Sequence, residues 1–200
     1  MTETQREIET QQVGYLELII GPMFSGKTTE LLKIFKQCQF CDISVSIINH
    51  SSDTRYHDMM LSSHDKIMAP CFQSTTLKDI WLNYEDRNVD ANMLMSSDVI
   101  LINEGQFFVD LYEVVVDMLD KNKKIYICGL DGDFNRNKFG ALLDLIPLCD
   151  KVHKLTAMCS LCKNGTPGIF SLRLSKETDQ TIIGSENYIP VCRKCYNNCR

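Results

Sequence analysis

The fold of this 200-residue chain is indicated most clearly by residues 21–28, Gly-Pro-Met-Phe-Ser-Gly-Lys-Thr. They fit the pattern G-x-x-x-x-G-K-[ST] and lie between an expected strand at Tyr15–Ile20 and an expected helix at Thr28–Gln39. In this pattern backbone N–H groups and the helix N-terminus bind phosphate oxygens, Lys27 reaches the β- and γ-phosphates, and the Thr28 hydroxyl ligates Mg²⁺. A simple glycine turn is the competing interpretation, but the flanking strand and helix favour a P-loop that binds phosphate groups.

The chain beyond the loop continues the same pattern. Short β-branched runs at 44–49, 98–103 and 124–128 alternate with helix-like stretches at 76–88 and 111–122. Strands that alternate with helices predict an α/β fold of the P-loop type, with a mostly parallel sheet covered by helices on both faces.

The last 50 residues differ in texture. An apolar piece at 151–157 leads into cysteine-rich turns and a hairpin with expected arms at 168–174 and 180–183. We therefore expect four segments along the chain: a flexible tail at 1–14, a P-loop α/β domain at 15–150, a small zinc-binding domain at 151–196 and a tail at 197–200.

The composition excludes several protein classes. Hydrophobic residues make up 44% and charged residues 24% of the chain, a balance typical of folded proteins rather than disordered or fibrous ones. No apolar stretch approaches the roughly 20 residues of a membrane-spanning helix, and the acidic N-terminus is unlike a secretory signal. We therefore expect a cytoplasmic protein without a membrane partner.

The charge is unevenly spread. The net charge is −5, yet residues 151–200 hold 8 Lys and Arg against 3 Asp and Glu. This basic end leaves open a zinc ribbon that binds nucleic acid, for which a steep loss of binding with added salt would be the mark. We expect no nucleic-acid partner, because the same basic segment can attract a phosphorylated ligand or another subunit.

A carboxylate follows one of the expected strands. The run at 98–103 ends in Asn103 and is followed by Glu104, which could accept the proton of an acceptor hydroxyl. A solvated acid at a strand end is the alternative. Asn103 stands where an Asp usually faces the metal, and its neutral oxygen predicts weaker Mg²⁺ binding or compensation by another acid such as Asp53.

Ten cysteines are distributed in a way that favours a metal site. Cys159 and Cys162 form one C-x-x-C pair, and Cys192 and Cys195 form a second after 29 intervening residues. Four thiolates at this spacing predict tetrahedral Zn²⁺ with a structural role, since no open position remains for catalysis. A redox pair or plain buried thiols are the alternatives. Cys199 is expected to lie outside the site.

A loop rich in glycine and aromatic residues follows the run at 124–128. It extends over residues 129–140 and includes Phe134 and Phe139. Loops that display aromatic side chains often bind a flat ligand, but the same side chains could only hold the loop down. The residues alone leave both interpretations open.

Taken together, these motifs resemble the cellular-type (type II) thymidine kinases. The stretches that carry the resemblance are Gly-Pro-Met-Phe-Ser-Gly-Lys-Thr-Thr-Glu-Leu at 21–31, Asp-Thr-Arg-Tyr at 53–56, Asn-Glu-Gly-Gln-Phe-Phe at 103–108, Leu-Asp-Gly-Asp-Phe at 130–134, Lys-Leu-Thr-Ala-Met-Cys-Ser-Leu-Cys at 154–162 and Val-Cys-Arg-Lys-Cys-Tyr at 191–196. They follow one another in unbroken order over residues 15–196.

The resemblance implies an activity and a set of site residues. It implies transfer of the γ-phosphoryl group of ATP to the 5′-hydroxyl of thymidine, with Glu104 as the general base and Mg²⁺ and structural Zn²⁺ as metals. The residues implied to bind the phosphates are Gly21, Pro22, Met23, Phe24, Ser25, Gly26, Lys27, Thr28, Arg55, Asn103 and Gln106. Those implied to bind thymidine are Met23, Phe107, Leu130, Phe134, Phe139, Ser171, Ile182, Gly184 and Tyr188.

The resemblance also implies features beyond single residues. The segment at 163–190 corresponds to a lasso loop that closes over thymidine and is anchored at both ends by zinc. The family further implies a homotetramer and feedback inhibition by thymidine triphosphate.

This sequence departs from the family pattern at a few positions. Asn103 replaces the usual Asp, Ser171 replaces the usual Thr, and the segment at 162–173 is about two residues longer. A kinase weakened at Asn103 and a P-loop ATPase without a nucleoside substrate therefore stay open as alternatives. Arg136 and Arg173 are weaker candidates than Arg55 for contact with the transferred phosphoryl group.

Overall fold

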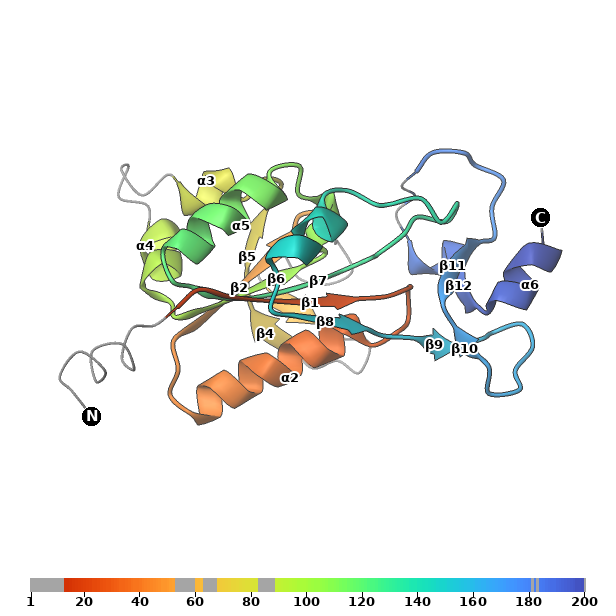
Figure 1. Ribbon diagram of the computed structural model, residues 1–200, viewed down its shortest axis with the longest axis horizontal. Helices are drawn as coiled ribbons and strands as arrows, with labels where there is room; N and C mark the ends of the chain where they lie inside the picture. Colours follow the sequence, from red (N-terminus) through yellow and green to blue (C-terminus); the bar gives the residue numbers. More distant parts are fainter. Residues whose placement is uncertain are drawn as a thin grey trace.

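A six-stranded parallel sheet forms the centre of the molecule (Figure 1). The computed structural model describes residues 13–52, 60–62, 68–82, 89–180, 182 and 184–199. The strand order is β5-β2-β6-β7-β1-β8, and every pairing is parallel. The strands are β1 (Tyr15–Ile20), β2 (Val45–His50), β5 (Phe72–Ser74), β6 (Val99–Asn103), β7 (Lys124–Gly129) and β8 (Lys151–Lys154).

Helices cover both faces of this sheet, as the alternation of strands and helices predicts. In Figure 1, α2 (Lys27–Phe40) lies on one face, while α3 (Lys78–Trp81), α4 (Val89–Ser96) and α5 (Leu111–Asp120) lie on the other. The two long helices, α2 and α5, each pack an apolar stripe at i, i+3 and i+4 spacing against the sheet. The buried apolar residues of α2 are Leu31, Leu32, Phe35 and Cys38, and those of α5 are Leu111, Val114, Val115 and Met118.

The strands contribute to both cores because their side chains alternate between the faces. Leu16 and Leu18 of β1 join the core beneath α5, whereas Ile19 joins the core beneath α2. The fold class predicted from the sequence, a P-loop-like α/β sheet, is confirmed by this layered arrangement.

The region between β5 and β6 differs from the expected single helix at 76–88. The observed α3 has only four residues, and α4 is a separate helix that the sequence analysis did not predict; residues 83–88 lie outside the described part. The Asp110 carboxylate accepts the backbone N–H groups of Leu77 and Lys78 and so fixes the start of α3. The apolar residues of α4 show only a weak helical periodicity, since Met93 is 53% exposed whereas the adjacent Leu94 is buried.

The C-terminal module, expected at 151–196, starts with a strand that belongs to the central sheet. Residues 151–154 form β8, which pairs with β1 and therefore extends the central sheet. Beyond it lie β9 (Ala157–Met158), β10 (Pro167–Gly168), β11 (Phe170–Arg173), β12 (Tyr188–Val191) and α6 (Arg193–Asn198).

The hairpin in this module pairs differently from the expectation. β11 pairs with β12, not with the arm expected at 180–183, of which residues 181 and 183 lie outside the described part. Residues 177–180 form a loop instead, whose backbone carbonyls accept hydrogen bonds from the side chain of Arg173. The module lies beyond the carboxyl ends of β1 and β7 (Figure 1), where parallel sheets place their ligand sites.

Two smaller features complete the fold. A short antiparallel hairpin consists of β3 (Met60–Ser62) and β4 (Met68–Pro70). Among the described helices, none is long and apolar enough to cross a membrane.

Candidate active site and zinc site

The loop between β1 and α2 has the backbone of a phosphate cradle. Gly26 has φ 85°, in the left-handed region where a side chain is strained, and α2 begins at the next residue. A Cβ on Gly21 would lie 2.5 Å from the carbonyl oxygen of Leu155, so only glycine fits there. Inside the loop, Lys27 is 8% exposed and its Nζ donates to the Pro22 carbonyl oxygen at 2.7 Å. The ammonium group is therefore folded over the loop, where phosphate oxygens bind in this motif.

The end of β6 brings a carboxylate next to this loop. Thr28 Oγ1 donates to Asn103 Oδ1 at 3.5 Å, which joins the first turn of α2 to the last residue of β6. Glu104 follows with φ 55°, and this left-handed backbone ends the strand. Its Oε2 accepts a hydrogen bond from Gln106 Nε2 at 2.7 Å.

Gln106 links the acid to the neighbouring strand end. It lies in the 3-10 helix η2 (Gly105–Phe107), is 3% exposed, and its Oε1 accepts the Leu130 N–H at 2.9 Å. A Cβ on Gly129 would lie 2.4 Å from that Oε1, and a Cβ on Gly140 would lie 2.1 Å from the Gln106 carbonyl oxygen. Two glycines of the 129–140 loop therefore permit the close packing that fixes Gln106.

Asn103 is held from both neighbouring strands. Its Nδ2 donates to Asn49 Oδ1 at 2.7 Å, and its Oδ1 accepts from Cys128 Sγ at 2.9 Å. No functional role was predicted from the sequence for Asn49 or Cys128. The signal that could have found them is position, because both lie near the carboxyl ends of strands that flank β6.

Mg²⁺ fits this strand end. A hydroxyl oxygen and an amide oxygen are ligand types that Mg²⁺ accepts, usually with several waters and the phosphates of a nucleotide. Thr28 and Asn103 supply one of each.

Aromatic rings form a wall beside Glu104. Phe107 meets Phe139 edge to face with ring centroids 5.4 Å apart, and it also lies 5.4 Å from the ring of His50. His50 was not identified from the sequence, where it directly follows the run expected as a strand at 44–49. Its Nδ1 accepts the Ser52 N–H at 3.1 Å. Burial lowers the pKa of His50, although a hydrogen bond with the Thr75 backbone and the nearby Glu104 carboxylate act in the opposite direction.

A hydrogen bond joins the C-terminal module to the P-loop. Ser171 Oγ on β11 accepts the backbone N–H of Met23 at 3.0 Å. This contact brings together two residues that the family resemblance places at the thymidine site. Ser171 is 5% exposed, so the hydroxyl is shielded from water.

Arg173, next on the same face of β11, organises the loop that follows. Its guanidinium lies 3.6 Å from the ring of Phe134 and donates from Nε and Nη2 to the Tyr188 hydroxyl at 3.2 and 2.6 Å. It also donates to three backbone carbonyls, those of Glu177, Asp179 and Gln180. The Tyr188 hydroxyl in turn accepts the Ile182 N–H at 3.3 Å.

Neither of the two weaker arginine candidates is placed to meet a phosphoryl group. All five N–H donors of Arg173 serve the loop and Tyr188, while Arg136 lies 4.5 Å from the ring of Tyr196 and bonds Asn197. Arg55 and Asp53 lie within 53–59, outside the described residues.

Gly184, which the family resemblance places at the thymidine site, has a backbone φ of 120°, a conformation that favours glycine.

The four predicted zinc ligands come together. The Sγ atoms of Cys159, Cys162, Cys192 and Cys195 all lie within 4.8 Å of one another. Four thiolates around Zn²⁺ would be about 3.8 Å apart, because Zn–S bonds are about 2.3 Å long, so the cluster fits this metal. Cys199 is exposed and is not part of the cluster.

The close packing of the four thiols shifts the pKa values of two of them in opposite directions. Burial raises the pKa of Cys159, but N–H groups of Cys162, Cys192 and Leu161 outweigh it and lower the pKa to about 6. The pKa of Cys195 is raised to about 12, first by its hydrogen bond with Cys192 and then by burial. A bound Zn²⁺ neutralises the repulsion between neighbouring thiolates.

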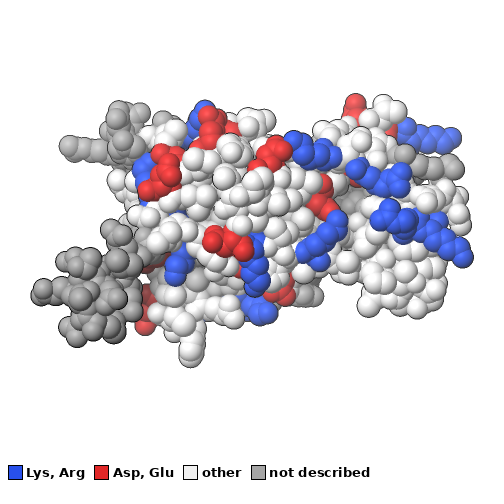
Figure 2. Space-filling view, viewed as in Figure 1, with Lys and Arg blue, Asp and Glu red and all other residues white. Residues whose placement is uncertain are grey.

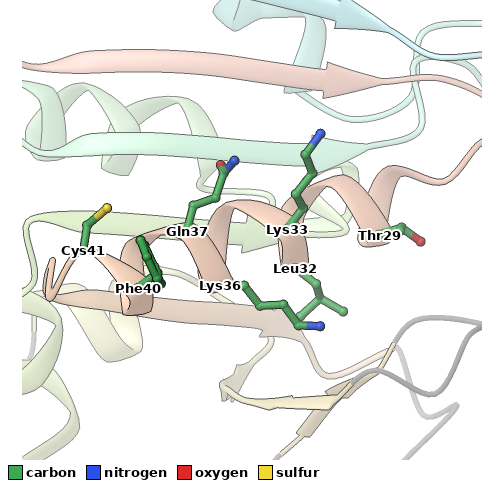
Figure 3. A pocket seen from close by; sticks show the side chains of 7 residues that line it. All are labelled: Thr29, Leu32, Lys33, Lys36, Gln37, Phe40 and Cys41. Atoms are coloured by element: carbon green, nitrogen blue, oxygen red, sulfur yellow. The ribbon is translucent and has the colours of Figure 1, made fainter.

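Two further surface features lie outside this site. A shallow groove of about 400 Å³ follows the outer face of α2 and is lined by Thr29, Leu32, Lys33, Lys36, Gln37, Phe40 and Cys41 (Figure 3). Figure 2 shows that Lys and Arg side chains outnumber acidic ones over the C-terminal module, whereas both signs are mixed over the α/β part.

Comparison with known proteins places this arrangement in a family. The family model described as thymidine kinase matches residues 14–196. A thymidine kinase of Arabidopsis thaliana is 43% identical over 95% of this chain and 78% of its own length. Thymidine kinase 1 of Dictyostelium discoideum is 38% identical over 96% and 81%, and the thymidine kinase of Sheeppox virus (strain KS-1) is 39% identical over 92% and 97%. The chain therefore belongs to the thymidine kinase family.

Proposed function

We propose that this chain transfers the γ-phosphoryl group of ATP to the 5′-hydroxyl of thymidine, giving thymidine monophosphate for nucleotide salvage. The observation that carries the proposal is the position of residues 103–107. At one end of this short segment Asn103 contacts Thr28 of the P-loop, and at the other Phe107 joins the aromatic wall with Phe139. A carboxylate, Glu104, lies between the phosphate site and the wall, as a base acting on a bound hydroxyl must.

The phosphate site is the P-loop with its strand-end neighbours. We assign to ATP the backbone N–H groups of the loop and the Lys27 ammonium, which offset phosphate charge. Thr28 and Asn103 would hold Mg²⁺, which when bound would offset negative charge on the phosphates. The residues proposed to bind ATP are Gly21, Pro22, Met23, Phe24, Ser25, Gly26, Lys27, Thr28, Arg55, Asn103 and Gln106.

Glu104 is proposed as the general base. Its carboxylate takes the proton of the 5′-hydroxyl as the oxygen attacks the γ-phosphorus, and the hydrogen bond from Gln106 fixes its orientation. Phosphoryl transfer needs little covalent help from protein, so position and charge account for the remaining catalysis.

The nucleoside pocket is proposed to lie between the aromatic wall and the zinc-anchored segment. Aromatic rings bind the flat base by stacking, and closure of the segment excludes water, which would otherwise compete as an acceptor. The residues proposed to line it are Met23, Phe107, Leu130, Phe134, Phe139, Ser171, Ile182, Gly184 and Tyr188. Structural Zn²⁺ at the four clustered cysteines would hold both ends of the segment.

Assembly, regulation and location complete the proposal. By analogy with the family we propose a homotetramer and inhibition by thymidine triphosphate, which offers the base of the product together with phosphates for the P-loop. We propose a cytoplasmic location, because a four-thiolate zinc site requires reduced cysteines.

The test is phosphoryl transfer from ATP with a panel of nucleosides and a control without nucleoside. Formation of thymidine monophosphate in step with ADP is expected, with little ATP hydrolysis in the control. Hydrolysis of ATP at the same rate with and without thymidine would contradict the proposal and favour a P-loop ATPase.

A further inference from the structure

The side chain of Asn103, at the end of β6, is held by polar side chains from the two neighbouring strands. Asn103 is fully buried, and it lies in register with Asn49 on the adjacent strand β2. Asn49 and Cys128 are each 1% exposed. Three polar side chains from three neighbouring parallel strands thus meet in a buried row next to the first turn of α2.

The row has a direction, because an amide has a donor end and an acceptor end. The donor end of Asn103 is used by Asn49, whose Oδ1 lies 2.7 Å from Asn103 Nδ2. The acceptor end receives the Cys128 thiol at 2.9 Å and the Thr28 hydroxyl at 3.5 Å. Rotating the Asn103 amide by half a turn would oppose two oxygens at the Asn49 contact and direct an N–H group at Thr28.

We propose that Asn49 and Cys128 are positioning residues that fix the Asn103 amide with its carbonyl oxygen toward Thr28. In this orientation the neutral side chain of Asn103 can offer an oxygen ligand to the Mg²⁺ of a bound nucleotide. A cation binds to the oxygen of the amide and is repelled by its N–H groups. A carboxamide can therefore replace a carboxylate as a metal ligand only if its orientation is fixed. The inference rests on the proposed use of Mg²⁺ and ATP, but not on thymidine as the acceptor.

The test compares ligand-induced stabilisation in matched variants. Nucleotide binding raises the unfolding temperature by mass action. For each protein, the unfolding temperature is measured without ligand, with ATP in EDTA, and with ATP and Mg²⁺. The informative quantity is the Mg²⁺ increment, the further rise that Mg²⁺ adds to ATP, together with the Mg²⁺ concentration at half effect.

Asn49→Leu removes the acceptor that holds the donor end of the amide, and Cys128→Ala removes a donor to its oxygen. We expect each to raise the half-effect Mg²⁺ concentration by about tenfold, since outer partners of metal ligands typically contribute that much. Stabilisation by ATP in EDTA is expected to stay as in the parent. Cys128→Ser retains an O–H donor and should restore the increment.

Ser46→Ala is the matched control. It removes a buried hydrogen bond of 2.7 Å between Ser46 and Ser97. Ser46 lies near the start of β2, whereas Asn49 lies near its end. The substitution should lower the unfolding temperature without ligand and leave the Mg²⁺ increment unchanged.

Two outcomes would overturn the inference. One is an unchanged Mg²⁺ increment in Asn49→Leu and Cys128→Ala despite a lower unfolding temperature, because the row would then be structural only. The other is an equal loss in the Ser46→Ala control. Absence of thymidine phosphorylation alongside a normal Mg²⁺ increment would instead count against the proposed function and leave the positioning role standing.

Discussion

At the residue scale, some residues of the site can be predicted from a sequence motif, whereas others are identified only from the packing of the folded chain. Lys27 and Thr28 could be predicted because phosphate binding imposes a fixed spacing on them, and Glu104 because it directly follows a predicted strand. His50 and Asn49 could not, since each becomes part of the site only when parallel strands align their carboxyl ends. The pairing register, which places them beside β6, is set by the whole sheet.

Gln106 provides a residue-scale prediction. Gln106→Leu removes the hydrogen bonds to Glu104 and to the Leu130 N–H while keeping a similar volume. The acid then loses its orientation, and kcat should fall by about ten- to a hundredfold, a larger factor than the rise in KM for ATP from the loss of Gln106 as a proposed ATP contact. Steady-state kinetics with both substrates would measure it, and an unchanged kcat would count against an orienting role.

His50 provides a second prediction, on pH. Burial holds the pKa of His50 below its ordinary 6.5, so below that pH the unfolded chain binds a proton that the folded chain does not. The free energy of unfolding should therefore decrease as the pH falls from 6.5 toward the lowered pKa. His50→Phe keeps an aromatic ring and should make this decrease shallower. Urea unfolding at pH 7.5, 6.5 and 5.5 gives the comparison, and equal slopes for both proteins would refute the assignment.

At the scale of elements, strands and long helices follow their sequence patterns, whereas short elements follow tertiary contacts. β1 spans the residues expected for it, and α5 begins at the residue expected for it. The partner of β11 was wrongly expected at 180–183, because β11 pairs with β12 and Arg173 holds the 177–180 backbone as a loop through part-buried hydrogen bonds. No local pattern marks a loop that is fixed by a side chain outside it.

This loop gives the element-scale prediction. Arg173→Lys keeps the charge but loses the planar fork that serves Tyr188 and three backbone carbonyls. The loop should loosen, raising KM for thymidine by about tenfold while KM for ATP stays constant. Arg193→Lys is the control, because Arg193 is exposed and only lies over the ring of Phe170. Equal effects of both changes would contradict the role of Arg173.

At the scale of the whole molecule, a module with a four-cysteine cluster is joined to an α/β sheet domain, and the two have different sources of stability. The sheet domain has two apolar cores, whereas the buried cluster of the module consists of Cys159 and Cys192 with Val191 and Tyr196. A core this small needs a metal or a similar constraint to fold.

Metal removal is the corresponding prediction. A strong zinc chelator should abolish thymidine binding, because both ends of the 163–190 segment lose their anchor, yet ATP binding at the P-loop should persist. Isothermal titration with each ligand before and after chelation, and after readdition of Zn²⁺, would measure this. Unchanged thymidine affinity in the metal-free protein would exclude the anchoring role.

In the proposed mechanism Glu104 deprotonates a thymidine hydroxyl at a P-loop that holds ATP. Its role is tested by a single-turnover measurement of thymidine monophosphate formation by the parent protein and by Glu104→Gln, with thymidine and ATP affinities measured for both. Transfer by the variant is expected to be at least about a hundredfold slower, with both affinities retained. Transfer at the parent rate by Glu104→Gln would contradict it.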